Sequence, residues 1–334
     1  MTLSYNRLLN LTNLTLGYLT SRLTRKVIHR GFPFALSIEP TNCCNLHCPE
    51  CPSGLKTLTR DRGYIDRDLF VKIIDQLNSS LLYLTFYFQG EPFLHPEFFE
   101  MVKYAREKNI FVSTSTNGHF LSDFNAKASI ASGLDQLIIS LDGIDQESYS
   151  LYRKGGSFDK VIEGIRKITA LKKELRSKTP KVVLQFLVLK SNQHQVEQVK
   201  NLGRELGVDK VSVKSAQFYD FEKGNPLMPD PGRHSRYRKI KLNGDSFLYV
   251  LKNKLSRHCL RMWGSCVITW DGWVVPCCFD KDAIYKFGNL NQQSFREIWN
   301  ADTYREFRQK ILSSRKTIEI CRNCTEGMGI SSIL

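Results

Sequence analysis

The chain has 334 residues, of which 42% are hydrophobic and 24% charged, and its formal net charge is +15. This composition is sufficient for one large domain with a smaller one beside it, and for a substantial core. Ten cysteines without a secretory signal argue against a disulfide scaffold and for metal ligation in a reducing compartment, so we expect a cytoplasmic protein. The basic excess indicates anionic partners or a membrane surface.

Residues 1–33 form a basic amphipathic segment, in which leucines alternate with arginines and no acidic residue precedes Glu39. We expect a helix that packs on its own domain and covers one end of it. Peripheral contact with an anionic membrane face is the alternative, because the segment is neither long nor apolar enough to span a bilayer. An organellar transit peptide would look similar.

Short β-rich runs alternate with stretches of helical spacing between residues 34 and 218. This alternation predicts an α/β fold of parallel βα units, in which catalytic groups lie at the carboxyl ends of the strands. The expected strands cover 34–38, 82–88, 110–115, 134–141, 182–189 and 210–213. The expected helices cover 68–77, 97–108, 125–132, 158–175 and 193–206.

Three cysteines follow the first expected strand with the spacing Cys44-x3-Cys48-x2-Cys51. Thiolates are the usual ligands of iron-sulfur clusters, and a cubane cluster has four irons, so three cysteines leave one iron open to a substrate or cofactor. A zinc site that borrows Cys43 or His47 as its fourth ligand is the alternative. A disulfide is less favoured, because neighbouring cysteines in a short loop pair poorly.

Polar clusters follow the next three expected strands. Gln89-Gly90-Glu91-Pro92 comes after the second strand, where the glycine permits close backbone approach and the carboxylate can accept from an ammonium group. Asn117-Gly118 and Asp142-Gly143 end the third and fourth runs, and each pair alone is a common turn. Their shared location at strand ends indicates a site.

The cysteine triplet and the order of these motifs resemble the radical S-adenosylmethionine (SAM) superfamily. The resemblance implies a partial (β/α)6 barrel over 34–218, open on one side for substrate, and a [4Fe-4S] cluster on Cys44, Cys48 and Cys51 whose open iron chelates SAM. Reductive cleavage of SAM then yields methionine and a 5'-deoxyadenosyl radical, which abstracts hydrogen from the substrate. The chain departs from the commonest motif at Glu50, where an aromatic residue usually contacts adenine.

The same resemblance implies a set of SAM contacts. The glycine-rich motif binds the amino group, and Arg153 reaches the carboxylate, for which a guanidinium fork is suited. A solvated arginine at a helix end is the alternative for Arg153. The complete set of expected SAM-binding residues is Gln89, Gly90, Glu91, Pro92, Asn117, Ser140, Asp142, Arg153 and Gln185.

The last quarter of the chain contains a second cysteine group after a stretch, 219–255, whose glycine, proline and basic residues suit a linker or substrate loop. Residues 256–334 resemble the SPASM or twitch domain, with an expected hairpin over 268–278 and one helix over 294–312. This implies one auxiliary [4Fe-4S] cluster on Cys259, Cys277, Cys321 and Cys324, with Cys266 and Cys278 left over. Tetrahedral zinc is the alternative.

These features together favour a radical SAM oxidoreductase supplied with electrons by a protein such as flavodoxin or ferredoxin. A small-molecule, sugar or lipid-linked substrate is favoured, because only about thirty residues precede the first strand, too few for a peptide-binding module. The alternatives are a peptide-modifying SPASM maturase and a non-catalytic zinc or iron-sulfur protein with an anionic partner. Scattered charges disfavour nucleic acid. The expected contacts to a phosphorylated substrate are Lys214, Arg233, His234, Arg236 and Tyr237.

Overall fold

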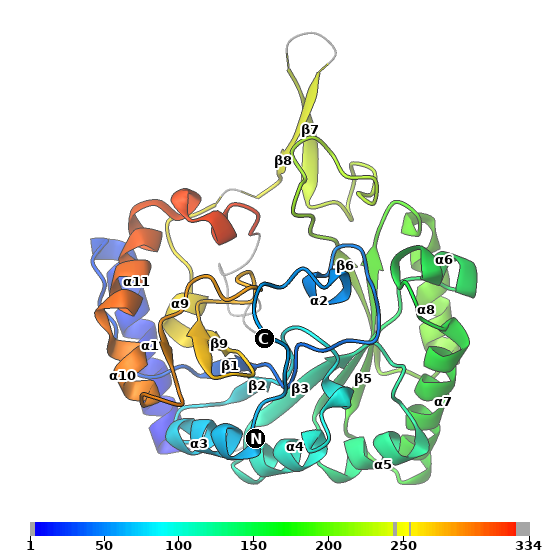
Figure 1. Cartoon of the computed structure of the whole chain (residues 1–334), viewed down its shortest axis with the longest axis horizontal. Helices are drawn as coiled ribbons and strands as arrows, with labels where there is room; N and C mark the ends of the chain where they lie inside the picture. The colour runs from blue at the N-terminus through cyan, green and yellow to red at the C-terminus, as the bar shows by residue number, and fades with distance from the viewer. Residues whose placement is uncertain (1–3, 243–245, 254, 325–334) are drawn as a thin grey trace. The chain divides into compact units, whose positions relative to one another are not determined.

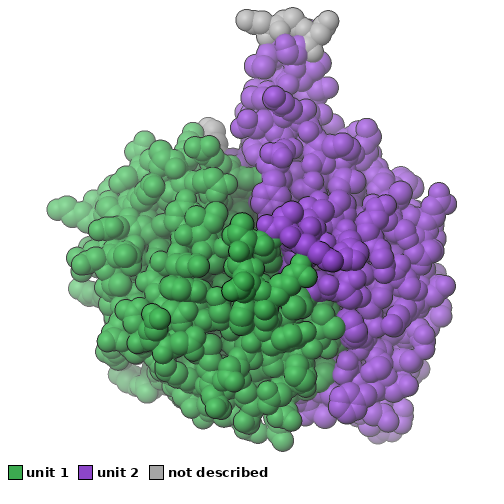
Figure 2. All heavy atoms as spheres, in the orientation of Figure 1, with its two compact units in different colours: residues 1–43, 58–114, 255–334 green, residues 44–57, 115–254 purple. Residues whose placement is uncertain are grey.

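The computed structural model describes residues 4–242, 246–253 and 255–324, which form two compact units (Figure 2). Unit 1 comprises residues 1–43, 58–114 and 255–334, and unit 2 comprises 44–57 and 115–254. Each unit therefore draws on segments that are distant in sequence. The contiguous division expected at 1–33, 34–218, 219–255 and 256–334 stays a prediction.

Unit 1 is built on parallel strands that are extended by a C-terminal antiparallel hairpin (Figure 1). β1 pairs in parallel with β2 on one side and with β9 on the other, Ala35 lying opposite Tyr83 and Ser265. β2 continues to β3, while β9 continues through antiparallel pairs to β10 and β11. The strands are β1 (Ala35–Ile38), β2 (Tyr83–Thr85), β3 (Phe111–Thr116), β9 (Ser265–Ile268), β10 (Trp273–Val275) and β11 (Gly288–Asn289).

The two helices next to β2 in the sequence each bury one apolar face, as their sequence spacing predicts. α3 (Arg67–Leu77) is capped by Asp66, whose carboxylate accepts from the backbone of Asp68 and Leu69. α4 (Phe98–Glu107) follows β2. The expected helix over 294–312 is instead two helices, α10 (Phe295–Asn300) and α11 (Asp302–Ser314), because Ala301 is extended with ψ 152°. Arg308 donates to the carbonyl of Trp299, which stabilises the break.

Unit 2 contains β4 (Gln136–Ser140), β5 (Lys181–Val188) and β6 (Lys210–Ser215), which pair in parallel in that order. Helices separate these strands in sequence, as expected for βα units. They are α5 (Asp123–Ala131), α6 (Gln146–Tyr152), α7 (Phe158–Glu174) and α8 (Val196–Glu205), the last of which follows a short 3-10 turn over Gln193–Gln195. All six expected strands thus occur, although β2 is shorter than the run over 82–88.

The stretch expected to be a linker, 219–255, contains a β-hairpin of β7 (Tyr237–Lys241) and β8 (Phe247–Leu251) (Figure 1). Tyr237 is fully buried and stacks on Phe221, with ring centroids 4.7 Å apart. Basic residues at alternate and adjacent positions of β7 hide the strand pattern in the sequence. The segment thus contains regular structure, and its role as a linker or substrate loop stays a prediction.

The N-terminal helix α1 (Tyr5–Thr24) packs on unit 1, as expected, but through polar groups. The buried guanidinium of Arg7 donates to the carbonyls of Asn78, Lys108 and Asn109. Figure 1 shows α1 beside α10 and α11, and Gln309 of α11 donates to the carbonyl of Arg25. Within the described ranges, no helix has both the length and the apolar character that crossing a lipid bilayer requires.

Candidate active site

The cysteine loop, residues 44–51, belongs to unit 2 and leads into the short helix α2 (Pro52–Leu55). Cys48 is buried, and Cys44 and Cys51 are half-buried against the same apolar cluster, which includes Tyr152 and Phe218. The backbone N–H of Cys51 donates to the carbonyl of Cys48 at 3.1 Å and closes the turn between them. Burial raises the pKa of the Cys48 thiol, and nearby Arg153 opposes that rise.

The two residues considered as a fourth ligand are engaged elsewhere. The thiol of Cys43 is hydrogen-bonded with Tyr64, and its carbonyl accepts from the backbone of Glu91 at 2.7 Å. His47 is exposed, and its Nδ1 lies 3.3 Å from the carbonyl of Gly54. A tetrahedral zinc would need sulfurs about 4 Å apart. In the part of the chain that is described, no group of three or more His, Cys, Asp or Glu side chains is arranged to hold a metal, for zinc and for an iron-sulfur cluster alike.

The end of β3 is hydrogen-bonded to the cysteine loop. The Asn117 amide donates to Asn45 Oδ1 at 2.8 Å, and its nitrogen lies 3.8 Å from the sulfur of Cys44. His119 holds this amide in place: its backbone donates to Asn117 Oδ1, while its Nε2 accepts from the backbone of Ser157 at 2.8 Å. Burial lowers the pKa of His119, which suits a neutral acceptor. The sequence reasoning overlooked His119, although it directly follows the Asn-Gly pair.

Half-buried Arg153 and buried Asp142 form an ion pair beside Cys48. Arg153 Nε donates to Asp142 Oδ2 at 2.6 Å, and its Nη1 lies 3.9 Å from the Cys48 sulfur. The other carboxylate oxygen accepts from the backbone of Leu187 at 2.7 Å. Burial lowers the pKa of Arg153, but the charge of Asp142 and the Cys48 thiol outweigh burial and hold it well above the usual value. Arg153 is therefore not a solvated helix end, and Asp142 is placed to orient it.

Ser140 and Gln185 lie opposite each other on β4 and β5, as Cα partners in the parallel register. Side chains at paired positions of neighbouring strands share one face of the sheet, so these two predicted SAM contacts are side by side. Ser140 is buried and Gln185 is half-buried. Asn192, which the sequence reasoning did not single out, is fully buried and donates to the Asp142 carbonyl at 3.0 Å.

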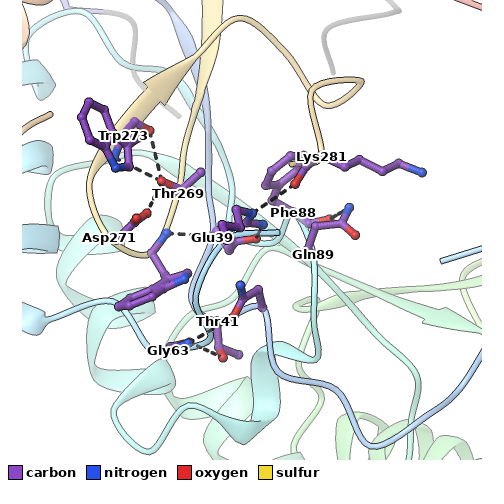
Figure 3. Close-up of polar contacts among 12 residues, drawn as sticks. Glu39, Thr41, Gly63, Phe88, Gln89, Thr269, Asp271, Trp273 and Lys281 are labelled. Atoms are coloured by element: carbon purple, nitrogen blue, oxygen red, sulfur yellow. Dashed lines mark hydrogen bonds and ion pairs between the residues drawn. The ribbon is translucent and has the colours of Figure 1, made fainter. Parts of the chain in front are cut away.

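In unit 1, the glycine-rich motif after β2 contacts the backbone that precedes the cysteine loop. Gly90 has φ +74°, and a Cβ there would lie 2.4 Å from the Thr41 carbonyl, so only glycine fits. The Glu91 carboxylate is buried and accepts from the backbone of Phe93 at 3.1 Å, capping the 3-10 turn Pro92–Leu94. Gln89 donates to the carbonyl of Phe88 (Figure 3). Because Cys43 adjoins Cys44, this motif fixes where the cysteine loop begins.

Glu39, at the end of β1, is the centre of a polar network that the sequence reasoning overlooked (Figure 3). Its fully buried carboxylate accepts two bonds of 2.5 Å from Arg60, and a third of 3.2 Å from the backbone of Trp270. Arg60 also donates to the carbonyl of Lys281 at 3.1 Å and lies over the Phe88 ring. The network joins the first strand to the C-terminal segment within unit 1.

The C-terminal cysteine site, defined as Cys259, Cys277, Cys321 and Cys324, is also in unit 1. Burial raises the pKa of Cys277 well above its usual value, and the nearby thiols of Cys278, Cys324 and Cys321 raise it further. Burial also raises the pKa of Cys321 to about 11. Arg315 donates to the Cys324 sulfur at 3.0 Å and to the carbonyl of His258, the neighbour of Cys259. The fold thus brings the four predicted ligands to one neighbourhood.

The two leftover cysteines have different surroundings. Cys266 lies on β9, opposite Leu36 of β1, and is buried in the core. Cys278 is half-buried, and its sulfur accepts from Arg261 at 3.4 Å.

A surface hollow of about 470 Å³ lies beside the β7–β8 hairpin, and we call it the hairpin hollow. One of its lining residues, Asn225, donates to Glu50 of the cysteine loop at 2.9 Å, which gives the unusual Glu50 a structural partner. Another, Tyr249, packs in the same apolar cluster as Cys44 and Cys51. The hollow is lined by Lys223, Gly224, Asn225, Pro226, Lys239, Phe247 and Tyr249.

The residues expected to contact a phosphorylated substrate do not include the lysines of this hollow. Tyr237 is fully buried, its hydroxyl accepting from the backbone of Phe218, so its prediction as a substrate contact was wrong. Arg236 donates to the carbonyl of Ser215 at 3.0 Å. Lys214 and Arg233 are exposed, and His234 is half-buried.

Two family models match the chain. The one described as the radical SAM superfamily matches residues 38–203, and the SPASM model, described as an iron-sulfur cluster-binding domain, matches 259–325. The chain belongs to the radical SAM superfamily, in its SPASM subgroup. It is therefore an enzyme of a family that uses a [4Fe-4S] cluster with SAM, and its SPASM domain implies auxiliary iron-sulfur chemistry. The predicted family, fold class and cofactors are confirmed.

Relatives of the chain have diverse activities. The chain is 28% identical to the tungsten-containing aldehyde ferredoxin oxidoreductase cofactor-modifying protein of Pyrococcus furiosus over 87% of this chain and 86% of that one. It is 26% identical to the PqqA peptide cyclase of Gluconobacter oxydans over 80% and 76%. The structure of BtrN in complex with AdoMet and 2-DOIA matches with a TM-score of 0.55 at 19% identity, covering 91% and 96% of the two chains. At 19% identity, the similarity to the BtrN structure shows a shared fold and nothing further.

Proposed function

We propose that this radical SAM enzyme is an oxidoreductase that abstracts hydrogen from an anionic small molecule, such as a phosphorylated sugar or a lipid-linked precursor. The bound [4Fe-4S] cluster and SAM supply the reductive cleavage that gives methionine and a 5'-deoxyadenosyl radical. The observation that carries the substrate class is the hairpin hollow, a basic and aromatic depression attached to the cysteine loop.

In this proposal, Cys44, Cys48 and Cys51 hold the SAM-binding cluster. The support is that the loop offers three sulfurs against one apolar cluster, while Cys43 and His47 are engaged elsewhere. Apolar side chains pack against the three cysteines, and the glycine at position 90 permits the close backbone approach just before the loop.

SAM is oriented by side chains at the strand ends of unit 2. Arg153, held by Asp142 through Nε, presents its remaining guanidinium nitrogens beside Cys48, where the carboxylate of SAM would bind the open iron. Asn117 and the Ser140–Gln185 pair supply amide and hydroxyl groups for the rest of SAM. We assign the binding of the SAM amino group to the motif after β2, with the Glu91 carboxylate as the acceptor. This motif consists of Gln89, Gly90, Glu91 and Pro92.

The C-terminal cysteine site holds one auxiliary cluster. Four buried or half-buried thiols in one neighbourhood would be costly to ionise without a cation, and iron supplies that charge. Arg315 stabilises the site by donating to Cys324. We assign to this cluster the acceptance of the substrate electron or the anchoring of the substrate.

The hairpin hollow suits a substrate with a negative group. Its volume is within the range of small-molecule sites. Lys223 and Lys239 supply positive charge, and Phe247 and Tyr249 supply apolar surface. Lys239 lies 3.8 Å from the centre of the Phe247 ring, which positions its ammonium at the hollow.

Peptide modification is the second candidate. Its support is the similarity to a protein named PqqA peptide cyclase, and to the mycofactocin maturase MftC of Mycobacterium tuberculosis. A peptide substrate would not require the two lysines of the hollow.

The test begins with protein purified and reconstituted without oxygen, reduced with dithionite and mixed with SAM. We expect about eight irons per chain, as two cubane clusters require, and formation of 5'-deoxyadenosine that increases with a member of a phosphorylated-sugar library. Lys223→Ala with Lys239→Ala should abolish that increase and leave basal SAM cleavage unchanged. The exposed residues Lys173 and Lys210, changed to alanine together, are the matched control. Stimulation by peptides alone would overturn the substrate class but not the radical SAM assignment.

A further inference from the structure

Helix α1 packs on unit 1 by the face that carries its polar anchors. Five buried or half-buried residues recur at helical spacing on that face, namely Arg7, Asn10, Leu14, Tyr18 and Ser21. Asn10 donates to the Phe32 carbonyl at 2.9 Å and accepts from its backbone N–H at 2.7 Å. Turning the helix to bury other residues would leave these groups without partners, so its orientation is fixed.

The opposite face of α1 exposes six large apolar side chains. Tyr5 and Leu23, near the two ends, are 78% and 82% exposed. At about 100° per residue, the six project within an arc of roughly 100°. We call this set the leucine stripe, and it consists of Tyr5, Leu8, Leu9, Leu16, Leu19 and Leu23. A soluble surface helix normally turns such a stripe toward its own core, whereas here the core side is already occupied by the polar anchors.

Positive charge lies at the C-terminal end of the stripe. Arg22, Arg25, Lys26 and Arg30 are all exposed, and no acidic residue precedes Glu39 in the sequence. Arg25 is held in place by a bond from its Nη1 to the carbonyl of Arg257 at 3.2 Å. An apolar stripe with adjoining cations matches the acyl boundary and headgroups of an anionic bilayer.

We propose that α1 is a membrane-surface anchor that lies in the plane of an anionic lipid bilayer, with the leucine stripe in the acyl boundary. A second copy of the chain is a less suitable occupant, because each copy carries a net charge of +15 and the copies would repel each other, whereas the same charge attracts an anionic surface. Since the helix is anchored to unit 1 by Arg7 and Asn10, the surface would hold the folded enzyme rather than a free tail.

The test is flotation of the reconstituted full-length enzyme with vesicles of phosphatidylglycerol and phosphatidylcholine in equal parts. We expect binding that weakens as salt is raised, and little binding to phosphatidylcholine alone. A triple variant of the stripe should bind the anionic vesicles at least about tenfold more weakly. Its changes are Leu16→Gln, Leu19→Gln and Leu23→Gln. Arg22→Gln with Lys26→Gln should remove the preference for the anionic lipid.

A matched control changes three exposed apolar residues that are outside α1, Phe124→Gln, Leu175→Gln and Ile284→Gln. This variant should float like the unchanged enzyme, and every variant should retain basal SAM cleavage, which shows that it is folded. Equal flotation of the stripe variant and the control would overturn the proposal. So would a concentration-dependent dimer, abolished by the stripe changes, in an enzyme that does not bind either vesicle.

Discussion

The cysteine loop takes its three sulfurs from one short stretch, Cys44 to Cys51, whereas the C-terminal cysteine site collects four from three separate segments between Cys259 and Cys324. The loop is determined by local spacing, and its sulfurs share one apolar cluster in unit 2. The C-terminal cysteine site exists only when α11 and the turn after it bring Cys321 and Cys324 toward Cys277. The first site can therefore be recognised from a short sequence motif, whereas the second forms only in the folded chain.

Each site also has one arginine whose nitrogen approaches a sulfur, half-buried in the first site and buried in the second, but the two arginines are held differently. Arg153 is oriented by the carboxylate of Asp142, which itself accepts from the backbone N–H of Leu187. Arg315 is oriented by the carbonyl of His258. Arg153 binds its carboxylate through Nε and approaches Cys48 through Nη1, whereas Arg315 donates directly to the sulfur of Cys324.

The largest expected effect separates the chemistry of the two sites. Cys48→Ala should reduce dithionite-driven SAM cleavage by at least about a thousandfold, because the cofactor carries the chemistry. Cys324→Ala should retain cleavage within about tenfold and lose only turnover of the substrate. Iron analysis should show that each variant loses about four irons. Loss of SAM cleavage in both variants to the same degree would contradict the separate roles.

A smaller effect distinguishes how the arginines are held. Asp142→Ala should lower the free energy of unfolding by about 3–5 kcal/mol, because it leaves the charge of Arg153 buried and unpaired. Arg315→Met should lower it by about 1.5–3 kcal/mol, the usual value of a hydrogen bond to a charged group. The measurement is anaerobic urea unfolding followed by tryptophan fluorescence, with Asp142→Asn as a control that keeps an acceptor. An equal loss of unfolding free energy in Asp142→Ala and Arg315→Met would contradict this difference between the two arginines.

The smallest expected effect concerns the ligand count. Cys266→Ala and Cys278→Ala should leave the iron content unchanged, because Cys266 lies in the core of the sheet and Cys278 accepts from Arg261. The Cys266 change removes a small buried group and should lower the free energy of unfolding by about 1 kcal/mol. Loss of iron from either variant would show that the C-terminal site uses a different set of four, or more than four, cysteines.

The sequence predicted those parts of the molecule that depend on local pattern. The six parallel strands follow from β-rich runs between helical stretches, and the triplet follows from its spacing. It did not predict the Glu39–Arg60 pair, because neither residue carries a motif and the two meet only through the fold. The hairpin at β7 and β8 was missed because Arg238, Lys239 and Lys241 interrupt the apolar alternation on which strand recognition depends.

Side-chain roles were predictable only as far as residue type. Arg153 and Asp142 were both singled out, but their pairing with each other depends on α6 ending beside the end of β4. Lys223 and Lys239 were not expected at a hollow, since nothing in sequence distinguishes them from other basic residues of the same segment.

The pairing of β1 with β9 has a consequence for synthesis. Ala35 leaves the ribosome long before Ser265, its partner in the parallel register, so the free edge of the first strand must wait for most of the chain to be translated. The Glu39 carboxylate likewise waits for Trp270. Unit 1 therefore completes its folding only after its C-terminal segment has been synthesised.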